Sequence, residues 1–442
     1  MAEYLAIAMA GVVAILSPLL ANLGRRRANM LVAVFLGVLF VVPTWLGIPF
    51  AGFFVPLHVI ALGLLLIAFS WAAMGIRIDS LDLVLLLLFV FVAASWPFGG
   101  ANPSHVVDFF VFWVVPYSVG RVVGAAVSAA SFERIVAPFA VVVSVWAIVE
   151  FAFHLHIFEN LVLPFGPSDR WASIQTRGPF ERSEGAFGHS IALGAALGYL
   201  LPFVLSKYSG LRRLVLTALL VAASFTTLSR SGLISAGVGA LMWSWSGRRA
   251  GGARVVQTLF GAVIAGLVVT FGLGSIDDLG GDEVTGSSAY RQGFWSLLGD
   301  VRLLGASRGA FMYEPGRTGY LSSEYPEGFA RSIDSTALLL ALRFGWIAAG
   351  IFVLALVIVA LRALKGGAPI ALIGAGALIP VVSTTAMITQ IPLIWWVSIG
   401  LSVTWLQLRR AGPVHDAEKE VRASVWQPGP RRRRLVRSLD GA

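Results

Sequence analysis

The stretch at residues 81–98 reads LDLVLLLLFVFVAASWPF, in which Asp82 is the only charged residue. An α-helix needs about 20 mostly apolar residues to cross the roughly 30 Å hydrocarbon layer of a bilayer. This stretch therefore predicts a transmembrane helix. Further stretches of the same kind lie on both sides of it along the chain. They are 4–23, 28–48, 53–74, 104–120, 133–153, 189–206, 212–228, 230–247, 254–274, 340–361, 368–387 and 391–408.

The composition agrees with many membrane spans. The 442 residues are 57% hydrophobic and 13% charged, with a mean hydropathy of +0.82, whereas soluble proteins carry about 25% charged residues. So many apolar side chains cannot be enclosed in one or two soluble cores, which excludes an ordinary cytosolic enzyme. The absence of cysteine excludes disulfides, thiolate chemistry and iron–sulfur clusters. We predict an all-α polytopic integral membrane protein with about 13 transmembrane helices.

The basic residues predict the orientation, because cytoplasmic loops carry an excess of Lys and Arg. All basic clusters fall on one side if the chain has thirteen spans and its N-terminus lies outside. The clusters are 25–27, 207–213, 248–254, 362–365 and the tail 409–442. The C-terminus is then cytoplasmic, and the Pro/Arg-rich tail is expected to be disordered. The net charge of +10 is thus explained by orientation and attraction to the inner leaflet, with no nucleic-acid partner.

Two predicted external segments, 154–188 and 275–339, are much longer than the other loops. Long connections of this kind are usually functional. The expected organisation is N-terminal helices (1–153), a first external loop (154–188), central helices (189–274), a large external loop (275–339), C-terminal helices (340–408) and a basic tail (409–442). The first apolar stretch is followed, not preceded, by basic residues, so it is expected to be a retained span and not a signal peptide.

The segment 177–189 reads RGPFERSEGAFGH and stands at the outer mouth of a predicted span. Arg177 and Arg182 suit a diphosphate, because a guanidinium binds phosphate oxygens bidentately and keeps its charge. Glu184 and His189 can form a pair that transfers a proton or positions a substrate. The alternative is a solvated loop with charge pairs, in which His189 caps the following helix.

Arg230 lies in the short external turn Ser229-Arg230-Ser231, against the usual bias of basic residues toward the inside. A charge at membrane depth is costly and often marks function, and the hydroxyls of Thr226 and Thr227 can bind the same anion. The alternative is an arginine that reaches to the lipid headgroups.

The large external loop adds a second group of candidates. Glycines between 290 and 311 allow the backbone to approach a ligand, and aromatic side chains suit the apolar faces of sugar rings. An amphipathic surface helix with a glycine-rich turn is the alternative. The sugar-contacting candidates are Tyr290, Trp295 and Phe311, and the further diphosphate-binding candidates are Arg291 and Arg308.

Carboxylates follow later in the same loop. Glu324, Glu327 and Asp334 are candidate general bases for a sugar hydroxyl, although Asp334 can instead cap the next helix. The sequence contains no phosphate-binding GxxxxGK[ST] motif and no metal-ligand spacing, so we expect neither an ATP-driven pump nor a metal site or other cofactor. Ionisable residues are rare in mid-span, which disfavours a proton-relay transporter.

These segments resemble the O-antigen ligase and polymerase superfamily, which comprises multispanning bacterial glycosyltransferases. Residues 182–194 are similar to its Arg-x-x-Gly-x-Phe-x-His/Asn block, and 228–232 to its Ser-Arg-Ser/Thr turn. Arg291 with Trp295, then Gly305 and Phe311, resemble the opening of its large loop, and Gly345-Trp346 resembles the close. Arg177 to Gly188 and Arg308 to Gly319 also fit an Arg-x10-Gly pattern of the polymerases.

The resemblance covers about residues 180–365 and implies a GT-C-like fold in the bacterial cytoplasmic membrane. It implies a metal-independent glycosyltransferase that polymerises undecaprenyl-diphosphate-linked repeat units into O-antigen, capsule or exopolysaccharide at the outer face. Its partners would be the lipid-linked donor and acceptor glycans, the bilayer and a chain-length regulator. Ligases of the superfamily carry an essential His in the large loop, whereas 275–339 contains none. This difference favours a polymerase, with ligase-type transfer to another acceptor and a lipid-linked oligosaccharide flippase as the alternatives.

Overall fold

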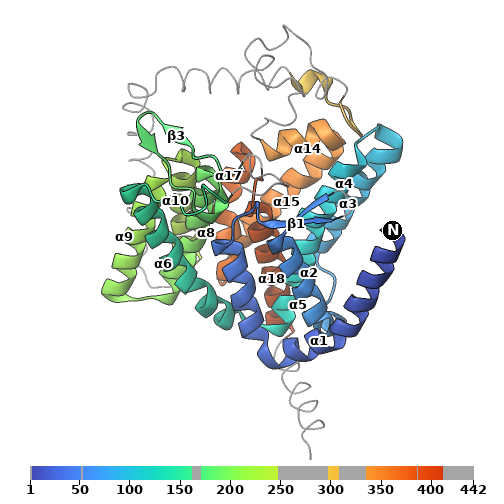
Figure 1. The fold of residues 1–442 in the computed structure, drawn as a ribbon, viewed down its shortest axis with the longest axis horizontal. Coiled ribbons are helices and arrows are strands. Elements are labelled where there is room, and N and C mark those ends of the chain that lie inside the picture. The colour runs from blue at the N-terminus through green and yellow to red at the C-terminus, as the bar shows by residue number, and fades with distance from the viewer. Residues whose placement is uncertain are drawn as a thin grey trace, which may run out of the picture.

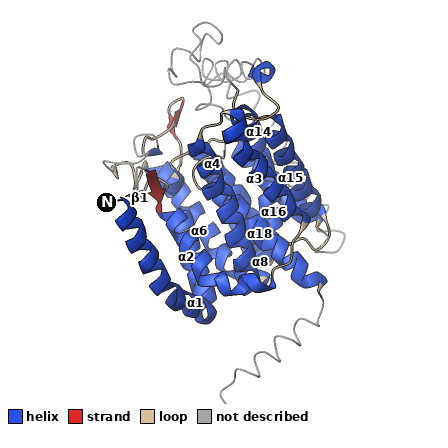
Figure 2. Ribbon diagram, turned by 90° about the vertical axis from the view of Figure 1, so that its right-hand side faces the viewer, coloured by secondary structure: helices blue, strands red, loops and turns tan. Residues whose placement is uncertain are grey.

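The computed structural model describes residues 2–50, 53–161, 171–246, 297–307, 335–385 and 387–411. This part of the chain is mostly helical (Figures 1 and 2). The long helices are α1 (Ala2–Val41), α2 (Leu57–Phe69), α3 (Ser80–Gly99), α6 (Ala129–Phe153), α8 (Ser190–Lys207), α9 (Gly210–Thr226), α10 (Arg230–Trp245), α15 (Trp346–Leu364) and α18 (Ile391–Arg410). Shorter helices are α4 (Pro103–Phe109), α5 (Val115–Ala126), α14 (Thr336–Phe344), α16 (Ile370–Ala377) and α17 (Ile379–Thr384).

Seven helical segments within the described residues are long and apolar enough to cross a membrane. They are Leu57–Gly75, Ser80–Gly99, Pro103–Ala126, Ala129–Phe153, Ser190–Lys207, Trp346–Leu364 and Ile391–Arg410. The chain is therefore an all-α polytopic membrane protein. The predicted span 254–274 lies outside the described residues.

Several expected spans take a more broken form. The stretch 4–23 and the part of 28–48 up to Val41 form the two arms of α1, which is kinked at Arg27 (φ −134°, ψ 33°). The expected span 340–361 begins inside the separate helix α14, because Gly345 adopts φ 98° and ends that helix. The expected span 368–387 is divided into α16 and α17 at Leu378, just before Pro380.

Two short antiparallel hairpins were not predicted from the sequence. Strands β1 (Gly47–Phe50) and β2 (Phe53–Pro56) pair with Gly47 opposite Pro56. Strands β3 (Thr176–Arg177) and β4 (Phe180–Glu181) pair with Arg177 opposite Phe180. Because α1 ends at Val41, two residues before Pro43, the predicted span 28–48 is too long at its C-terminal side.

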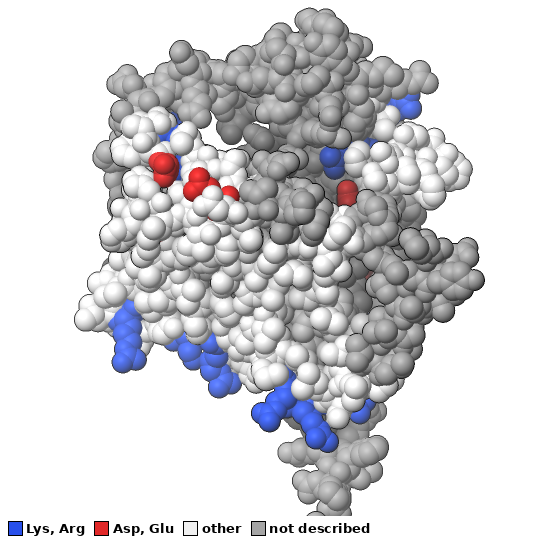
Figure 3. Space-filling model, in the orientation of Figure 1, with Lys and Arg blue, Asp and Glu red and all other residues white. Residues whose placement is uncertain are grey.

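The charged residues separate the two ends of the helical bundle. Most Lys and Arg visible in Figure 3 gather along its lower edge, which we call the basic end. This end contains residues 25–27, 207–213, 362–365 and 409–410. Its contacts include the ion pair between Arg362 Nη1 and Asp79 Oδ1 (2.7 Å) and that between Arg121 Nη2 and Asp82 Oδ2 (3.1 Å).

The opposite end, which we call the loop end, contains residues 42–50, 53–56, 154–161, 171–189, 226–230, 385 and 387–390. Side chains tie these segments together. Trp45 Nε1 donates a hydrogen bond to the carbonyl oxygen of Leu161 (2.9 Å), and Gln390 Nε2 donates one to the carbonyl oxygen of Ala186 (3.0 Å).

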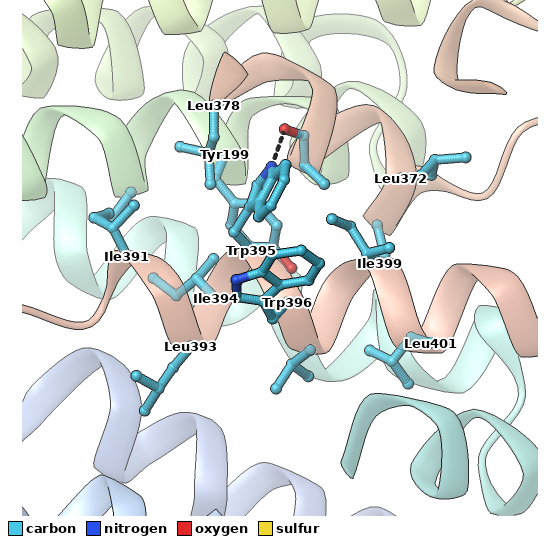
Figure 4. Packing of buried hydrophobic residues seen from close by; sticks show 14 of the residues in the cluster. Tyr199, Leu372, Leu378, Ile391, Leu393, Ile394, Trp395, Trp396, Ile399 and Leu401 are labelled. Carbon is cyan, nitrogen blue, oxygen red and sulfur yellow. Dashed lines mark hydrogen bonds between the residues drawn. The ribbon is translucent and has the colours of Figure 1, made fainter. Parts of the chain in front are cut away.

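Helices α8 and α18 form the centre of the bundle, and most of their residues are buried. Figure 4 shows Trp395 and Trp396 of α18 packed near Tyr199 of α8. Trp395 Nε1 donates a hydrogen bond to the carbonyl oxygen of Ala375 (3.0 Å), and Ser398 Oγ bonds the Tyr199 hydroxyl (2.9 Å). The loop 171–189 leads directly into α8, so the core fixes the position of that loop.

Candidate functional site

The turn between α9 and α10 presents Arg230 at the loop end. Leu228 adopts a left-handed conformation (φ 47°) that ends α9. Ser229 then caps α10, because its Oγ accepts a hydrogen bond from the backbone N of Gly232 (3.2 Å) and lies 3.0 Å from Ser231 Oγ. Arg230 is consequently the first residue of α10.

Arg177 and Arg182 both contact this turn, although they lie far from it in sequence. Arg177 Nη1 donates to the carbonyl oxygen of Leu228 (2.7 Å), and Arg182 Nε donates to that of Thr227 (2.9 Å). These carbonyls stand at the C-terminal end of α9, where the helix dipole favours a positive charge. Three of the predicted diphosphate-binding arginines are therefore gathered at one turn, and two of them also anchor the loop to α9.

Glu184 lies in the loop 171–189 and is buried, with 5% of its surface exposed. Its Oε1 accepts a hydrogen bond from the backbone N of Gln175 (2.9 Å). Burial raises the pKa of Glu184 to about 7, since the charged form loses hydration. A carboxyl group that titrates near neutral pH is suited to accept and return a proton.

His189 caps α8, as in the structural alternative for this residue. Its Nδ1 accepts a hydrogen bond from the backbone N of Ile191 (3.2 Å), and its ring meets Trp171 edge-on at 6.1 Å between centroids. Gln175 connects Glu184 to Ser190, the first residue of α8. The Oε1 of Gln175 accepts a hydrogen bond from Ser190 Oγ (2.8 Å), while its backbone N bonds Glu184.

A His–carboxylate network that the sequence did not predict lies beside Glu184. His154 adopts a left-handed conformation (φ 53°) that ends α6 and turns the chain back. This places His156 Nδ1 2.9 Å from Glu150 Oε1, and His156 Nε2 3.2 Å from Glu181 Oε2. His154 Nδ1 also lies 2.8 Å from Glu181 Oε2. The pKa of His156 is raised, chiefly by its hydrogen bond to Glu150.

Glu150 connects this network to the loop of Glu184. Its Oε2 accepts hydrogen bonds from the backbone N of Gly185 (2.8 Å) and of Glu184 (3.2 Å). The position of Glu150 inside the predicted span 133–153 is the sequence feature that could have indicated this contact, because charges within spans are costly and often functional. Within the described ranges, no group of three or more His, Asp or Glu residues is arranged to hold a metal ion.

A small cavity of about 10 Å³, partly open to solvent and with room for about one water molecule, lies against Glu184. Gly188 (φ 59°) lets its walls approach, since a Cβ there would lie 2.5 Å from the Trp45 ring and 2.4 Å from the Trp171 carbonyl oxygen. The cavity is lined by Trp45, Glu150, His156, Phe158, Glu159, Trp171, Ala172, Ile174, Glu184 and Gly185.

The other predicted site residues lie outside the described part of the chain. They are Tyr290, Arg291, Trp295, Arg308, Phe311, Glu324, Glu327 and Asp334. No family model, curated protein or solved structure matches the chain.

Proposed function

We propose that the chain is a glycosyltransferase that polymerises undecaprenyl-diphosphate-linked repeat units at the outer face of the bacterial cytoplasmic membrane. The observation that carries this proposal is the gathering of Arg177 and Arg182 at the turn between α9 and α10, which ends at Arg230. Arginines on an external membrane surface, next to a buried carboxyl group, suit a reaction between an anionic leaving group and a hydroxyl nucleophile.

In the proposed reaction, a hydroxyl oxygen of the acceptor glycan attacks the anomeric carbon of the donor. The bond from that carbon to the diphosphate oxygen breaks, and its electron pair leaves with the polyprenyl diphosphate. Arg177, Arg182 and Arg230 neutralise the charge that develops on this leaving group. Arg291 and Arg308 are proposed to join them from the large external loop, with Tyr290, Trp295 and Phe311 as sugar contacts.

Glu184 is the proton acceptor that we propose for the acceptor hydroxyl. Its pKa of about 7 allows it to take up a proton near neutral pH, whereas His189 Nδ1 is used to cap α8. Glu324, Glu327 and Asp334 are the alternative bases. The proposal requires no metal and no cofactor, because the glycosyl diphosphate bond supplies the free energy.

We further propose that the basic end faces the cytoplasm, following the positive-inside rule, with the N-terminus outside and the C-terminus inside. The described segment 171–246 ends at the basic end, where the carbonyl oxygen of Ser246 accepts a hydrogen bond from Gly367 N (3.3 Å). The next described segment, 297–307, lies at the loop end, where Ala306 N donates a hydrogen bond to the carbonyl oxygen of Gly99 (3.1 Å). We propose that the apolar stretch 254–274 of the sequence, which lies outside the described residues, crosses the membrane, for a count of thirteen spans.

The test is chain growth by the full-length protein in proteoliposomes supplied with a purified undecaprenyl-diphosphate-linked repeat unit. We expect a ladder of lipid-linked products, and a loss of about 10²-fold in rate for Arg230→Ala, as for removal of a group that stabilises transition-state charge. Arg26→Ala is the matched control, because Arg26 is an exposed arginine at the basic end. Its rate should not change.

Other outcomes would contradict the proposal. Unchanged growth with Arg230→Ala would refute the role of the arginine turn. A single transfer to a distinct acceptor would identify a ligase, and movement of the lipid-linked glycan across the bilayer without lengthening would identify a flippase.

A further inference from the structure

We infer that Glu150, His156 and Glu181 form a latch that attaches the β3–β4 hairpin to the end of α6 while His156 is protonated. The latch releases the hairpin when the solution at the loop end becomes alkaline. The three side chains come from three places in the chain: Glu150 from the last turn of α6, His156 from the turn that follows it, and Glu181 from β4.

Carboxylates stand at both nitrogens of the His156 ring. Nδ1 lies 2.9 Å from Glu150 Oε1, and Nε2 lies 3.2 Å from Glu181 Oε2. A neutral imidazole carries one N–H group, whereas the imidazolium carries two. Only the protonated ring can therefore donate to both carboxylates at once, and its positive charge strengthens both hydrogen bonds.

Burial decides which of the two hydrogen bonds survives when the ring loses a proton. The side chain of Glu150 is 4% exposed, whereas that of Glu181 is 38% exposed. A buried carboxylate that loses its donor is costly, while a half-exposed one can bind water instead. The proton therefore leaves from Nε2 of His156, and the bare nitrogen then faces Glu181 as a second acceptor. The link to the hairpin opens, and the link to α6 remains.

The charged groups around His156 act in the same direction. Besides its two partners, the carboxyl groups of Glu159 and Glu184 line the small cavity beside the ring, and they favour the imidazolium when they are ionised. The pKa of His156 is raised, chiefly by its hydrogen bond to Glu150. The latch is thus complete below the ordinary value of 6.5 and is lost as pH rises through the raised pKa.

Two further contacts hold the hairpin without a charge on His156. His154 Nδ1 lies 2.8 Å from Glu181 Oε2, and a neutral His154 can still donate from this nitrogen. Phe180 stacks on Phe151 with ring centroids 6.5 Å apart. Opening of the latch therefore loosens the hairpin without unfolding it.

The latch bears on the arginines because Arg177 lies in β3 and Arg182 directly follows β4. Both arginines bond to carbonyl oxygens at the end of α9. With the latch closed, this segment is attached to α6 and to α9, and with the latch open the arginines are positioned from α9 alone. Control of chain growth by this route rests on the proposed function, whereas the latch itself does not.

The experiment is hydrogen exchange of the backbone amides of 176–182 in the full-length protein in nanodiscs, from pH 6 to pH 10, followed by mass spectrometry. Each rate is divided by the intrinsic exchange rate at that pH. The paired strands and Arg182 N, which donates to the Gln175 carbonyl oxygen (2.9 Å), report on the hairpin. We expect protection to fall roughly tenfold over this range, as for the loss of one charged hydrogen bond. Constant protection would overturn the inference.

Two variants of Glu181 test the latch itself. Glu181→Ala should show the low protection already at pH 6, with little further change as pH rises. Glu181→Gln should remove the dependence on pH, because an amide can accept a hydrogen bond from the protonated ring or donate one to the neutral ring. A full pH transition in both variants would overturn the inference.

Two matched controls test the neighbouring carboxyl groups. Glu159 is exposed, lines the same cavity and is not one of the two partners of His156, so Glu159→Ala should keep the transition. Glu184→Gln should keep it as well, although Glu184 itself has a pKa of about 7. Loss of the transition in either control would assign it to that carboxyl group and overturn the latch.

Chain growth separates this inference from the proposed function. The ratio of the rates of the unmodified protein and Glu181→Ala should fall toward one as pH rises, because the latch is then open in the unmodified protein too. The titration of Glu184 affects both rates and cancels in this ratio. A pH-dependent hairpin in a protein that does not lengthen glycans would refute the polymerase and keep the latch. Chain growth with a constant ratio and constant protection would refute the latch and keep the polymerase.

Discussion

His156 Nδ1 lies 2.9 Å from Glu150 Oε1, and the two side chains are only 6% and 4% exposed. This pair closes the turn at the end of α6 and fixes the carboxylate that holds the backbone of Glu184 and Gly185. The loop that carries Arg182 and Glu184 is therefore attached on two sides, to α6 through Glu150 and to α9 through its arginines.

Glu150→Ala should destabilise the protein by about 2–4 kcal/mol, because it leaves the buried His156 and two backbone N–H groups without their acceptor. Thermal unfolding in detergent measures the loss, and hydrogen exchange at Glu184 and Gly185 should become faster. Glu159→Ala, at an exposed carboxylate of the same region, should change stability by less than about 0.5 kcal/mol. Equal effects of the two variants would contradict this role of Glu150.

Glu184→Gln should make the protein more stable at high pH. The pKa of Glu184 is about 7 in the folded chain, against an ordinary value of 4.5. The folded state therefore binds this proton more tightly, so the contribution to stability is complete below pH 4.5 and is lost as pH rises to about 7. Removing the group should give a gain of about 3 kcal/mol at pH 8 and none near pH 4.

Unfolding curves of the two proteins from pH 4 to pH 8 measure this difference. The pKa of His156 is raised, so its stabilisation is also lost on going to higher pH. His156 is present in both proteins, so its contribution to the unfolding free energy largely cancels when the two proteins are compared. A difference in unfolding free energy that is constant with pH would contradict the burial of an ionisable Glu184.

Arg182→Ala should release the loop from α9. The variant loses the hydrogen bond from Nε to the Thr227 carbonyl oxygen, and a charged hydrogen bond of this kind is worth about 1.5–3 kcal/mol. Hydrogen exchange in 182–187 should become faster, together with a lower unfolding temperature. Arg134→Ala is the control, because Arg134 is exposed and contacts only its own helix in the hydrogen bonds seen. Unchanged exchange in Arg182→Ala would contradict the anchoring role.

Gly400→Ala should separate α5 from α18. A Cβ at Gly400 would lie 2.2 Å from the Tyr117 carbonyl oxygen, which is backbone and cannot move aside. Overpacking of this kind costs about 1–3 kcal/mol. Gly350→Ala, in α15, is the matched control because a Cβ there meets no atom within 4 Å, and it should change stability by at most about 1 kcal/mol. A similar unfolding temperature for both variants would contradict the close packing.

The apolar stretches predicted the helices well where they run without interruption. The expected spans 81–98, 133–153, 189–206 and 391–408 agree with α3, α6, α8 and α18 to within four residues. Hydropathy fails where the backbone changes direction inside an apolar run. Gly345 separates α14 from α15 within one apolar run. At Arg27, by contrast, two expected spans follow each other as the two arms of the kinked helix α1. Hydropathy is insensitive to such backbone angles, because it depends only on side-chain composition.

The candidate site was predicted in part. The motifs around Arg182 and Arg230 were recognisable in sequence, and the structure brings them together through Thr227. The cavity was not predictable, because its walls are Trp45, His156 and Trp171, which lie in three separate segments. The contacts of His154 with Glu181 and of His156 with Glu150 were not predicted either.

The burial of α8 has a mechanical consequence. Because α8 begins at Ser190 and most of its side chains contact other helices, lipid acyl chains press mainly on outer helices such as α3 and α15, which expose large apolar side chains. Changes in bilayer thickness or lateral pressure would tilt those outer helices first. The loop before α8 is held at its C-terminal end by this buried helix, whereas its other anchors are on α6 and α9, which also expose large apolar side chains. A change of lipid should therefore act on the loop through those two anchors and leave its junction with α8 in place.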